Sequence, residues 1–254
     1  MKVAICYVCP IVKWDVYEPI VRRFLSAYKA FPPGLDHEFH VIFNGGKPTS
    51  QMVELFSGMS SISHEHDNTG WDIGAFSTMA EVDCDEMLFL GTNTNFRRAG
   101  WLQRIIEVRQ KFGTGLFGTS ASYDIYPHIR TNGYLCRPEL VGLAWEKNRL
   151  HRNPRHGFEL GKLSLTDTAL AQNVPVYLVT WDGYYPRSEW RIAPDIYRRG
   201  DQSNCLIYDR HHEIYEASGP KRRIQLEKIA DGNKFEYYRA AIKARLQRWM
   251  SAQK

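Results

Sequence analysis

Polar side chains that could hold a small molecule end or follow several short apolar runs of this sequence. They comprise a phenol, two amides and a hydroxyl, at Tyr7, Asn44, Asn93 and Thr92. Such groups supply hydrogen bonds to a polar ligand, and an aromatic ring supplies an apolar wall. Because they recur at the same place in successive runs, we expect them to meet at one binding site.

A second group of polar residues occurs in the motif NTGWDIGAF, residues 68–76. It offers an amide, a carboxylate and two glycines, at Asn68, Asp72, Gly70 and Gly74. The glycines would let a ligand approach the backbone closely. A structural alternative stays open, in which Asn68 and Thr69 cap a helix, the glycines allow tight packing, and Asp72 suits a first helical turn.

Apolar runs alternate with stretches of helical periodicity along the chain. The runs predict strands at residues 2–8, 37–43, 60–64, 86–90, 114–118, 133–136 and 174–180. The periodic stretches predict helices at residues 15–31, 50–55, 68–82, 99–111, 138–147 and 164–171. This alternation indicates a single open, mostly parallel α/β sheet flanked by helices. Ligands of such sheets lie beyond the carboxyl ends of the strands, where the polar groups above fall.

Two common phosphate-binding signatures are absent from the sequence. Neither a GxGxxG motif nor a Walker loop follows a predicted strand, which argues against a dinucleotide-dependent oxidoreductase and an ordinary nucleoside triphosphatase. Residues 182–209 are rich in Arg, Tyr, Pro and Gly and predict an ordered loop. We therefore expect one domain at residues 1–219 and a basic amphipathic helical tail at residues 220–254.

The motif NTGWDIGAF and the later segment FELGKLSLTDTALAQNVPVYLV are similar to rhamnan synthesis F-like glycosyltransferases and, more loosely, to family-2 inverting glycosyltransferases. The order of elements over residues 1–182 resembles the A-type glycosyltransferase fold. The resemblance implies a nucleotide-sugar donor (a UDP-, dTDP- or GDP-sugar) and transfer with inversion to a glycan, lipid-linked or small-molecule hydroxyl. It implies donor contacts from Tyr7, Asn44, Asn68, Gly70, Asp72, Gly74, Thr92 and Asn93.

The metal motif of the resembled fold is missing. A-type transferases usually carry Asp-x-Asp after the strand that residues 86–90 match, but this chain has Gly-Thr-Asn-Thr-Asn at 91–95. Hard cations such as Mg²⁺ and Mn²⁺ prefer carboxylate oxygens, so metal dependence is in doubt and no metal ligand is assigned. The pair Asp83 and Asp85 precedes the strand and is interpreted as a solvated turn.

Without a metal, cationic side chains would have to stabilise the leaving diphosphate. The candidates are Arg97, Arg98, His128, Arg130, Arg198, Arg199, Arg210, His211 and His212, of which Arg130, Arg199 and His211 are assigned to the donor site. The segment RRGDQSNCLIYDRHH is interpreted as a lid over the diphosphate. For each single residue, an ordinary surface charge is the alternative.

Inverting transfer also needs a carboxylate that accepts the proton of the acceptor hydroxyl. In the resembled families an acidic residue begins the helix after the acceptor loop, and the matching residue here is Glu159. Asp167 and Asp124 are the second and third candidates. A surface carboxylate is the alternative for Glu159, and a first helical turn is the alternative for Asp167.

Charge and cysteine usage indicate which partners and which cellular compartment the protein has. The net charge is +5, but residues 221–254 hold ten basic and three acidic residues and so carry +7, which leaves −2 for the rest. This distribution argues against nucleic-acid binding, which requires basic charge over a face or groove. Five scattered cysteines, no signal peptide and no long apolar run favour the cytoplasm.

The tail repeats apolar residues at helical spacing among basic ones, namely Phe235, Tyr238, Ile242, Leu246 and Trp249. It could lie on the anionic inner face of a membrane or pack on the protein itself. His64 and His66 could share a strand face, but no third ligand accompanies them and no metal site is predicted there. A nucleotidyltransferase and a non-catalytic nucleotide-sugar-binding module remain the alternatives, and the oligomeric state is left open.

Overall fold

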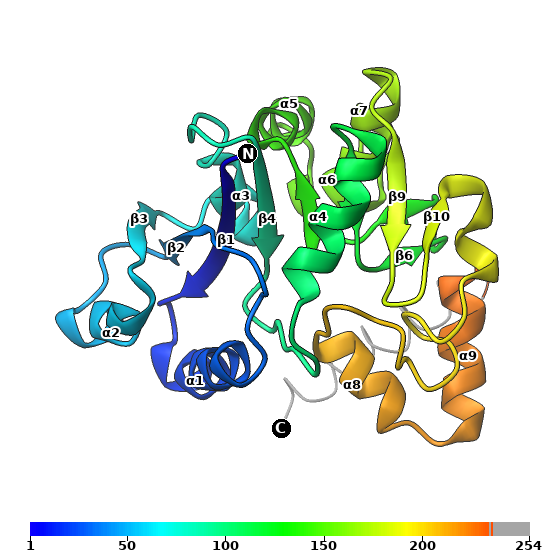
Figure 1. Ribbon diagram of the computed structural model, residues 1–254, viewed down its shortest axis with the longest axis horizontal. Helices are drawn as coiled ribbons and strands as arrows, with labels where there is room; N and C mark the ends of the chain where they lie inside the picture. Colours follow the sequence, from blue (N-terminus) through cyan, green and yellow to red (C-terminus); the bar gives the residue numbers. More distant parts are fainter. Residues whose placement is uncertain (234, 236–254) are drawn as a thin grey trace.

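The computed structural model describes residues 1–233 and 235, which form an eight-stranded sheet covered by helices on both faces (Figure 1). The strand order is β10-β9-β5-β8-β4-β1-β2-β3. In chain order the strands of this sheet are β1 (Val3–Pro10), β2 (Glu38–Asn44), β3 (Ile62–His66), β4 (Glu86–Leu90), β5 (Leu116–Gly118), β8 (Tyr134–Cys136), β9 (Val176–Val179) and β10 (Tyr184–Pro186).

Most of the sheet is parallel, as predicted. β1 pairs in parallel with β2 and β4, β2 with β3, and β5 with β9. β8 is inserted antiparallel between β4 and β5, and β10 is antiparallel to β9 at the edge. Because β1 is covered on both faces, residues 3–9 are all buried, which explains its continuous apolar sequence.

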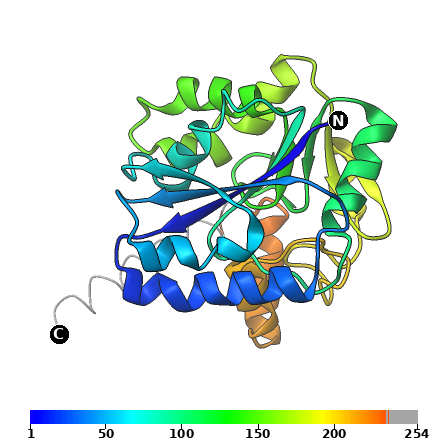
Figure 2. The same cartoon turned by 60° about the vertical axis from the view of Figure 1, so that its left-hand side comes forward.

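Helices form two layers that cover the sheet (Figure 2). α1 (Trp14–Ala30), α2 (Ser50–Glu54) and α4 (Trp101–Phe112) pack on one face. α3 (Trp71–Ser77), α5 (Pro138–Asn148), α6 (Pro154–Leu160) and α7 (Leu165–Ala171) pack on the other. The predicted open α/β architecture is confirmed, with a 3₁₀ turn η1 (Ser57–Met59) between α2 and β3.

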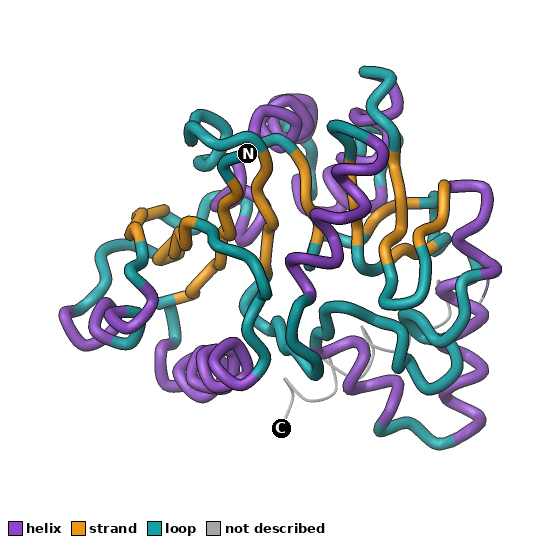
Figure 3. The backbone as a smooth tube through the Cα atoms, in the orientation of Figure 1, coloured by secondary structure: helices purple, strands orange, loops and turns teal. Residues whose placement is uncertain are grey.

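Several short elements were not predicted. The ribbon β6 (Ala121–Ser122) and β7 (His128–Ile129), the helix α6, strand β10 and the 3₁₀ helix η2 (Arg187–Ile192) all lie in stretches without clear periodicity. α8 (Arg210–Glu216) begins inside the expected lid segment. Its first turn is fixed by Asp209, whose carboxylate accepts the backbone N–H of His211 and His212. Figure 3 shows how these short elements alternate with long loops.

The described part of the expected tail is α9 (Pro220–Ala230), whose residues Leu226, Ile229 and Ala230 are buried. The carbonyl oxygen of Ala230 accepts a 2.7 Å hydrogen bond from the backbone N–H of Tyr123. Of the apolar stripe only Phe235 falls within the described residues, so the rest of the predicted amphipathic pattern lies outside them. No helix in the described residues is both long and apolar enough to span a bilayer.

Candidate functional site

A cavity of about 590 Å³ opens at the carboxyl edge of the parallel strands. This volume lies within the range of small-molecule sites. The wall combines amides, aromatic rings, carboxylates and cations, and consists of Val8, Pro10, Val12, Lys13, Tyr17, Asn44, Asn68, Trp71, Asp72, Gly91, Thr92, Asn93, Arg130, Thr131, Asn132, Arg155, Asp209, Arg210 and His211. Seven of the predicted donor-site residues therefore lie on one wall: Asn44, Asn68, Asp72, Thr92, Asn93, Arg130 and His211.

The sheet topology explains why these distant residues meet. β1, β2 and β4 run in parallel, so the segments that follow them emerge at one edge. β8 runs the other way, so the residues that precede it, Arg130 to Asn132, reach the same edge. An isolated bridge between Asn95 and Tyr208 then places the start of α8 beside the loop that follows β4.

At the β2 end of the cavity two amides are held by each other and by a histidine. The Asn44 amide donates a 2.9 Å hydrogen bond to Asn68, and Nδ1 of His66 lies 2.8 Å from Asn44 Oδ1. Thr69 donates its backbone N–H to Asp67 instead of capping α3 with its side chain. The amides are thus oriented before a ligand arrives, and neither Asn68 nor Thr69 caps α3 with its side chain, which disfavours the structural alternative for these two residues.

Three non-glycine residues of the wall have left-handed backbones. The φ angles are 60° for Lys13, 72° for Asn68 and 57° for Trp71. Such conformations are unfavourable for bulky side chains and are enriched at functional sites. Trp71 is also 51% exposed although it is large and apolar. An exposed ring held by a strained backbone is suited to stack against a flat or cyclic ligand.

The two motif glycines have structural roles. Gly70 has φ 73°, and a Cβ there would lie 2.2 Å from the Trp145 ring. A Cβ at Gly74 would lie 1.8 Å from the carbonyl oxygen of Thr69. Neither glycine lines the cavity, so the structure favours the packing alternative over close approach of a ligand.

The loop after β4 is held rigidly but offers no carboxylate. Asn132 Oδ1 accepts the backbone N–H of Gly91 at 2.8 Å and the Thr94 hydroxyl at 2.7 Å. Thr92 donates its hydroxyl to the carbonyl of Val8 at 3.0 Å. With hydroxyl and amide groups in place of an acidic pair, this loop does not fit a hard divalent cation. Among the described residues no group of three or more His, Cys, Asp or Glu side chains could hold a metal ion.

Tyr7 lies behind this loop instead of on the cavity wall. Its ring is fully buried and stacks on Phe24 at a centroid distance of 3.8 Å, on the α1 face of the sheet. Its hydroxyl donates to the carbonyl of Thr92 at 3.1 Å. The structure thus corrects the expected ligand contact, since Tyr7 instead supports the loop that borders the cavity.

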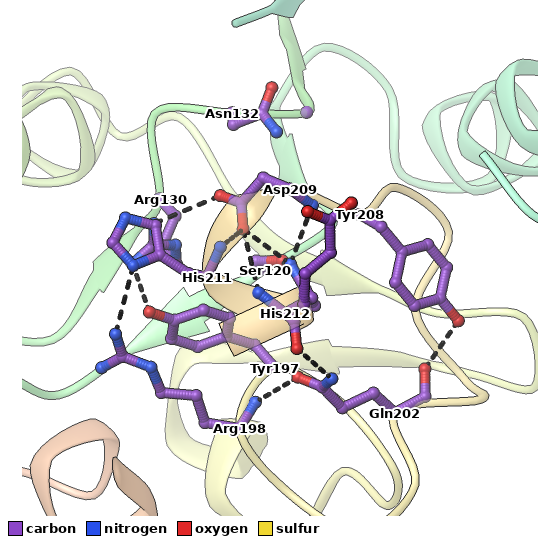
Figure 4. Close-up of polar contacts among 12 residues, drawn as sticks. Ser120, Arg130, Asn132, Tyr197, Arg198, Gln202, Tyr208, Asp209, His211 and His212 are labelled. Atoms are coloured by element: carbon purple, nitrogen blue, oxygen red, sulfur yellow. Dashed lines mark hydrogen bonds and ion pairs between the residues drawn. The ribbon is translucent and has the colours of Figure 1, made fainter. Parts of the chain in front are cut away.

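A largely buried arginine, Arg130, also lines the cavity, and Figure 4 shows it beside Asp209 and His211. Arg130 donates to the Tyr197 hydroxyl at 2.6 Å and to Asp209 at 3.4 Å, and its guanidinium lies over the Tyr197 ring. Burial lowers the pKa of Arg130, but Tyr197 and Asp209 outweigh burial and keep the pKa above its ordinary value. Its Nε has no hydrogen-bond partner among the described residues, so this permanent cation has a hydrogen bond left for an anion.

Arg210 and His211 line the same cavity. Burial and the nearby Arg130 lower the pKa of His211 to about 4, so its imidazole is neutral at pH 7. Nδ1 of His211 lies 3.3 Å from the Arg198 guanidinium. The expected cation at His211 is therefore a neutral hydrogen-bonding group until an anion arrives. His212 is buried against Asp209 and does not line the cavity.

Two carboxylates occupy the side of the cavity formed by α3 and α6. Asp72 lines it, and its Oδ1 is buried without a hydrogen bond, 3.7 Å from Nε of Arg155. Glu159 lies at the end of α6, behind the wall, and accepts the backbone N–H of Thr131 at 3.3 Å. The sequence placed Glu159 ahead of a helix, whereas it ends one, because Asn153 and Pro154 start α6 earlier.

The remaining candidates lie away from the cavity. Asp167 faces Arg187 beside α7, and Asp124 pairs with Ser122 in the β6–β7 ribbon. Arg199 binds Asp231 near α9, and Arg97 binds Glu216 of α8.

Asp83 and Asp85 are exposed at the opposite edge of the sheet, as predicted. The wall also contains residues that were not predicted from the sequence, among them Lys13, Tyr17, Trp71, Asn132 and Arg155. Of these five, only Trp71 carried a signal, because it lies inside the NTGWDIGAF motif.

No protein-family profile and no curated protein matches the sequence. Among solved structures, the chain is similar to residues 1–349 of S. aureus TarS in complex with UDP, with TM-score 0.44, 10% identity, and coverage of 61% of this chain and 53% of that one. It is also similar to the galactosyltransferase LgtC in complex with donor and acceptor sugar analogs, with TM-score 0.38, 13% identity, and coverage of 54% and 58%. The chain thus covers little more than half the length of each of these proteins. The proposed function therefore depends on the cavity of this chain.

Proposed function

We propose that this protein is a glycosyltransferase that moves a sugar from a nucleotide-sugar donor to an acceptor hydroxyl. The supporting observation is a single cavity with oriented amides and an exposed aromatic ring at one end and a buried arginine at the other. A nucleotide sugar has the matching order of groups, with a planar base and ribose followed by a diphosphate and a sugar. The complexes of TarS with UDP and UDP-GlcNAc agree with a donor of this class.

The nucleoside lies at the β2 end in this proposal. Asn44, Asn68 and Asn93 hydrogen-bond the base and ribose, and Trp71 stacks against a ring. The diphosphate then extends along the loop after β4 towards α8. This orientation places the most negative part of the donor against the most basic part of the wall.

Transfer proceeds without a divalent cation in this proposal. Arg130, Arg210 and Lys13 neutralise the charge that grows on the leaving diphosphate, and the His211 imidazole adds a hydrogen bond. Arginine suits this role because its planar fork binds phosphate oxygens in pairs. The acceptor oxygen attacks the anomeric carbon from the side opposite the diphosphate, which inverts the configuration.

The acceptor is a glycan or a lipid-linked hydroxyl, and the enzyme works in the cytoplasm at the inner face of the membrane. This part of the proposal depends on the charge of +7 in residues 221–254, since basic segments bind anionic lipid surfaces. Sedimentation of the full chain with vesicles that contain phosphatidylglycerol tests it. Binding at low salt that is lost at high salt is expected, and no binding at low salt would rule it out.

Thermal shift with UDP, GDP, dTDP and their sugars tests the central proposal, because a ligand that binds only the folded state raises the melting temperature. At least one nucleoside diphosphate should do so, and its sugar should be consumed with release of that diphosphate. Binding without turnover with any acceptor or water would instead identify a non-catalytic nucleotide-sugar-binding module. Turnover of a nucleoside triphosphate and a sugar phosphate would identify a nucleotidyltransferase.

A further inference from the structure

The two carboxylates at the α3–α6 side of the cavity differ in their access to a ligand. Asp72 lies on the wall, and its buried Oδ1 accepts no hydrogen bond from the described residues, although Nε of Arg155 lies 3.7 Å away. Glu159 is not part of the wall, and its Oε1 already accepts the backbone N–H of Thr131. The Asp72 carboxylate therefore lies against the cavity with a loose ion pair to Arg155 and without a hydrogen bond at Oδ1, so it keeps the capacity to accept a hydrogen bond from a ligand.

The charged surroundings of the two groups also differ. Burial raises the pKa of Asp72, Arg155 lowers it, and Glu159 raises it again, with a net increase. Burial alone would raise the pKa of Glu159, but Arg130, His128 and Arg155 outweigh it and leave the pKa below its ordinary value. When the surroundings of two neighbouring carboxylates separate their pKa values, the two groups commonly have different roles in catalysis. The carboxylate with the higher pKa is the better proton acceptor.

We infer that Asp72 is the catalytic base of the proposed transfer and that Glu159 is a positioning residue that holds Arg130 and Thr131 in place. This inference rests on the proposed function, and it replaces both the donor-binding role expected for Asp72 and the base role expected for Glu159. An ionised Glu159 facing Arg130 keeps that arginine oriented towards the diphosphate, and its bond to Thr131 fixes the wall between Arg130 and Asn132.

The acceptor oxygen forms a bond to the anomeric carbon of the donor while the bond from that carbon to the β-phosphate oxygen breaks. The diphosphate leaves with the electron pair of the broken bond, and Arg130 faces its new charge. The hydroxyl proton passes to the carboxylate of Asp72, which releases it to solvent before the next turnover.

Three groups face Asp72 from neighbouring elements. Arg155 and Glu159 approach from α6, and Tyr134 approaches from β8 with a buried hydroxyl that has no hydrogen-bond partner. Burial raises the pKa of Tyr134 well above its ordinary value, so its hydroxyl stays neutral. The protonation of Asp72 therefore responds to the two charges on α6, which have opposite effects.

The test uses the full chain and follows nucleoside diphosphate release from UDP-, dTDP- and GDP-sugars with water as the acceptor. Asp72→Asn should lower turnover by about 10²–10⁴-fold, the usual contribution of a positioned base. Affinity for the nucleoside diphosphate should stay unchanged, since the base contacts the hydroxyl. Glu159→Gln should weaken diphosphate binding and lose less turnover than Asp72→Asn. Glu146→Gln, which changes an exposed carboxylate that pairs with Arg149, is the matched control and should match wild type.

The pH dependence of turnover is a second test, and it leaves Asp72 unchanged. Turnover should fall as pH drops through the raised pKa of Asp72, and this fall is the acid limb of the profile. Glu159→Gln removes a neighbouring negative charge and should move this limb to lower pH, whereas Arg155→Gln should move it to higher pH. A merely structural role for either neighbour would not shift the limb in opposite directions.

The outcomes separate the two proposals. If Asp72→Asn keeps its turnover, or loses diphosphate affinity in proportion to turnover, Asp72 is not the base although the enzyme remains a glycosyltransferase. If neither α6 variant moves the acid limb, the assignment also fails. If wild type binds and cleaves none of the donors, the proposed function itself is wrong.

Discussion

Oδ1 of Asn132 accepts a 2.8 Å hydrogen bond from the backbone N–H of Gly91, and this contact joins the segment before β8 to the loop after β4. The same oxygen accepts the Thr94 hydroxyl. The loop that would hold a metal in the resembled fold is thus fixed by an amide from another strand.

This relationship leads to the prediction that nucleoside diphosphate release survives excess EDTA unchanged. The physical reason is that Arg130 and Arg210 supply the positive charge that a cation would otherwise supply. Rates are measured after exhaustive chelation and again after addition of Mn²⁺. A rate that collapses with EDTA and returns with Mn²⁺ would show that the diphosphate is bound through a metal.

Arg210→Ala should weaken UDP binding by about tenfold or more, because a hydrogen bond to a charged group contributes roughly 1.5–3 kcal/mol. Uridine binding should stay unchanged, since uridine has no phosphate to contact an exposed arginine at the α8 end of the cavity. Isothermal titration of both ligands measures the difference. Arg222→Ala, an exposed arginine on α9, is the control. An equal loss for uridine and UDP would place the nucleoside, not the diphosphate, beside α8.

The sheet and its binding edge could be predicted from the sequence. Both depend on local patterns, namely the periodicity of apolar residues and the polar residues that follow each apolar run. Asn44, Asp72 and Thr92 all follow or flank apolar runs, and all lie on the cavity wall. Tyr7 could not be placed in the same way, because alternate residues of a strand face opposite sides and only helix packing decides which side meets the ligand. Its ring meets Phe24 of α1.

Residues that reach the cavity through tertiary packing left no local pattern. Arg155 belongs to α6, a seven-residue helix, and it approaches Asp72 only because α3 and α6 pack on the same sheet face. Asn132 reaches the edge because β8 runs antiparallel to β4, which a three-residue apolar run cannot indicate. The sequence left two roles open for Gly70 and Gly74, ligand approach and tight packing, because it does not show that Trp145 and Thr69 crowd them.

Trp71→Gly should stabilise the fold relative to Trp71→Ala by about 1 kcal/mol, because glycine adopts a positive φ without the steric cost of a Cβ. Both variants should lose nucleotide affinity to the same extent, since both remove the exposed ring. Denaturation and UDP titration of the two variants measure the two effects separately. Unchanged UDP affinity in both variants would show that the ring of Trp71 does not contact the donor.

The pH dependence of stability should report on His211, whose pKa is lowered to about 4 by burial and by Arg130. In the unfolded chain a histidine has a pKa of about 6.5, so between these values the unfolded state binds more protons than the folded state. Stability should therefore fall as pH drops from about 6.5 towards 4, by an amount on the order of 1–3 kcal/mol.

His211→Gln should flatten this part of the curve, because glutamine keeps a hydrogen-bonding group but does not titrate. Denaturant unfolding of both proteins at several pH values provides the measurement, and His151→Gln, an exposed histidine, is the matched control. The control should keep the wild-type slope. Addition of UDP should reduce the wild-type slope, because an anion beside His211 favours its protonated form in the folded state. A His211→Gln slope equal to that of wild type would mean that another group causes the loss of stability.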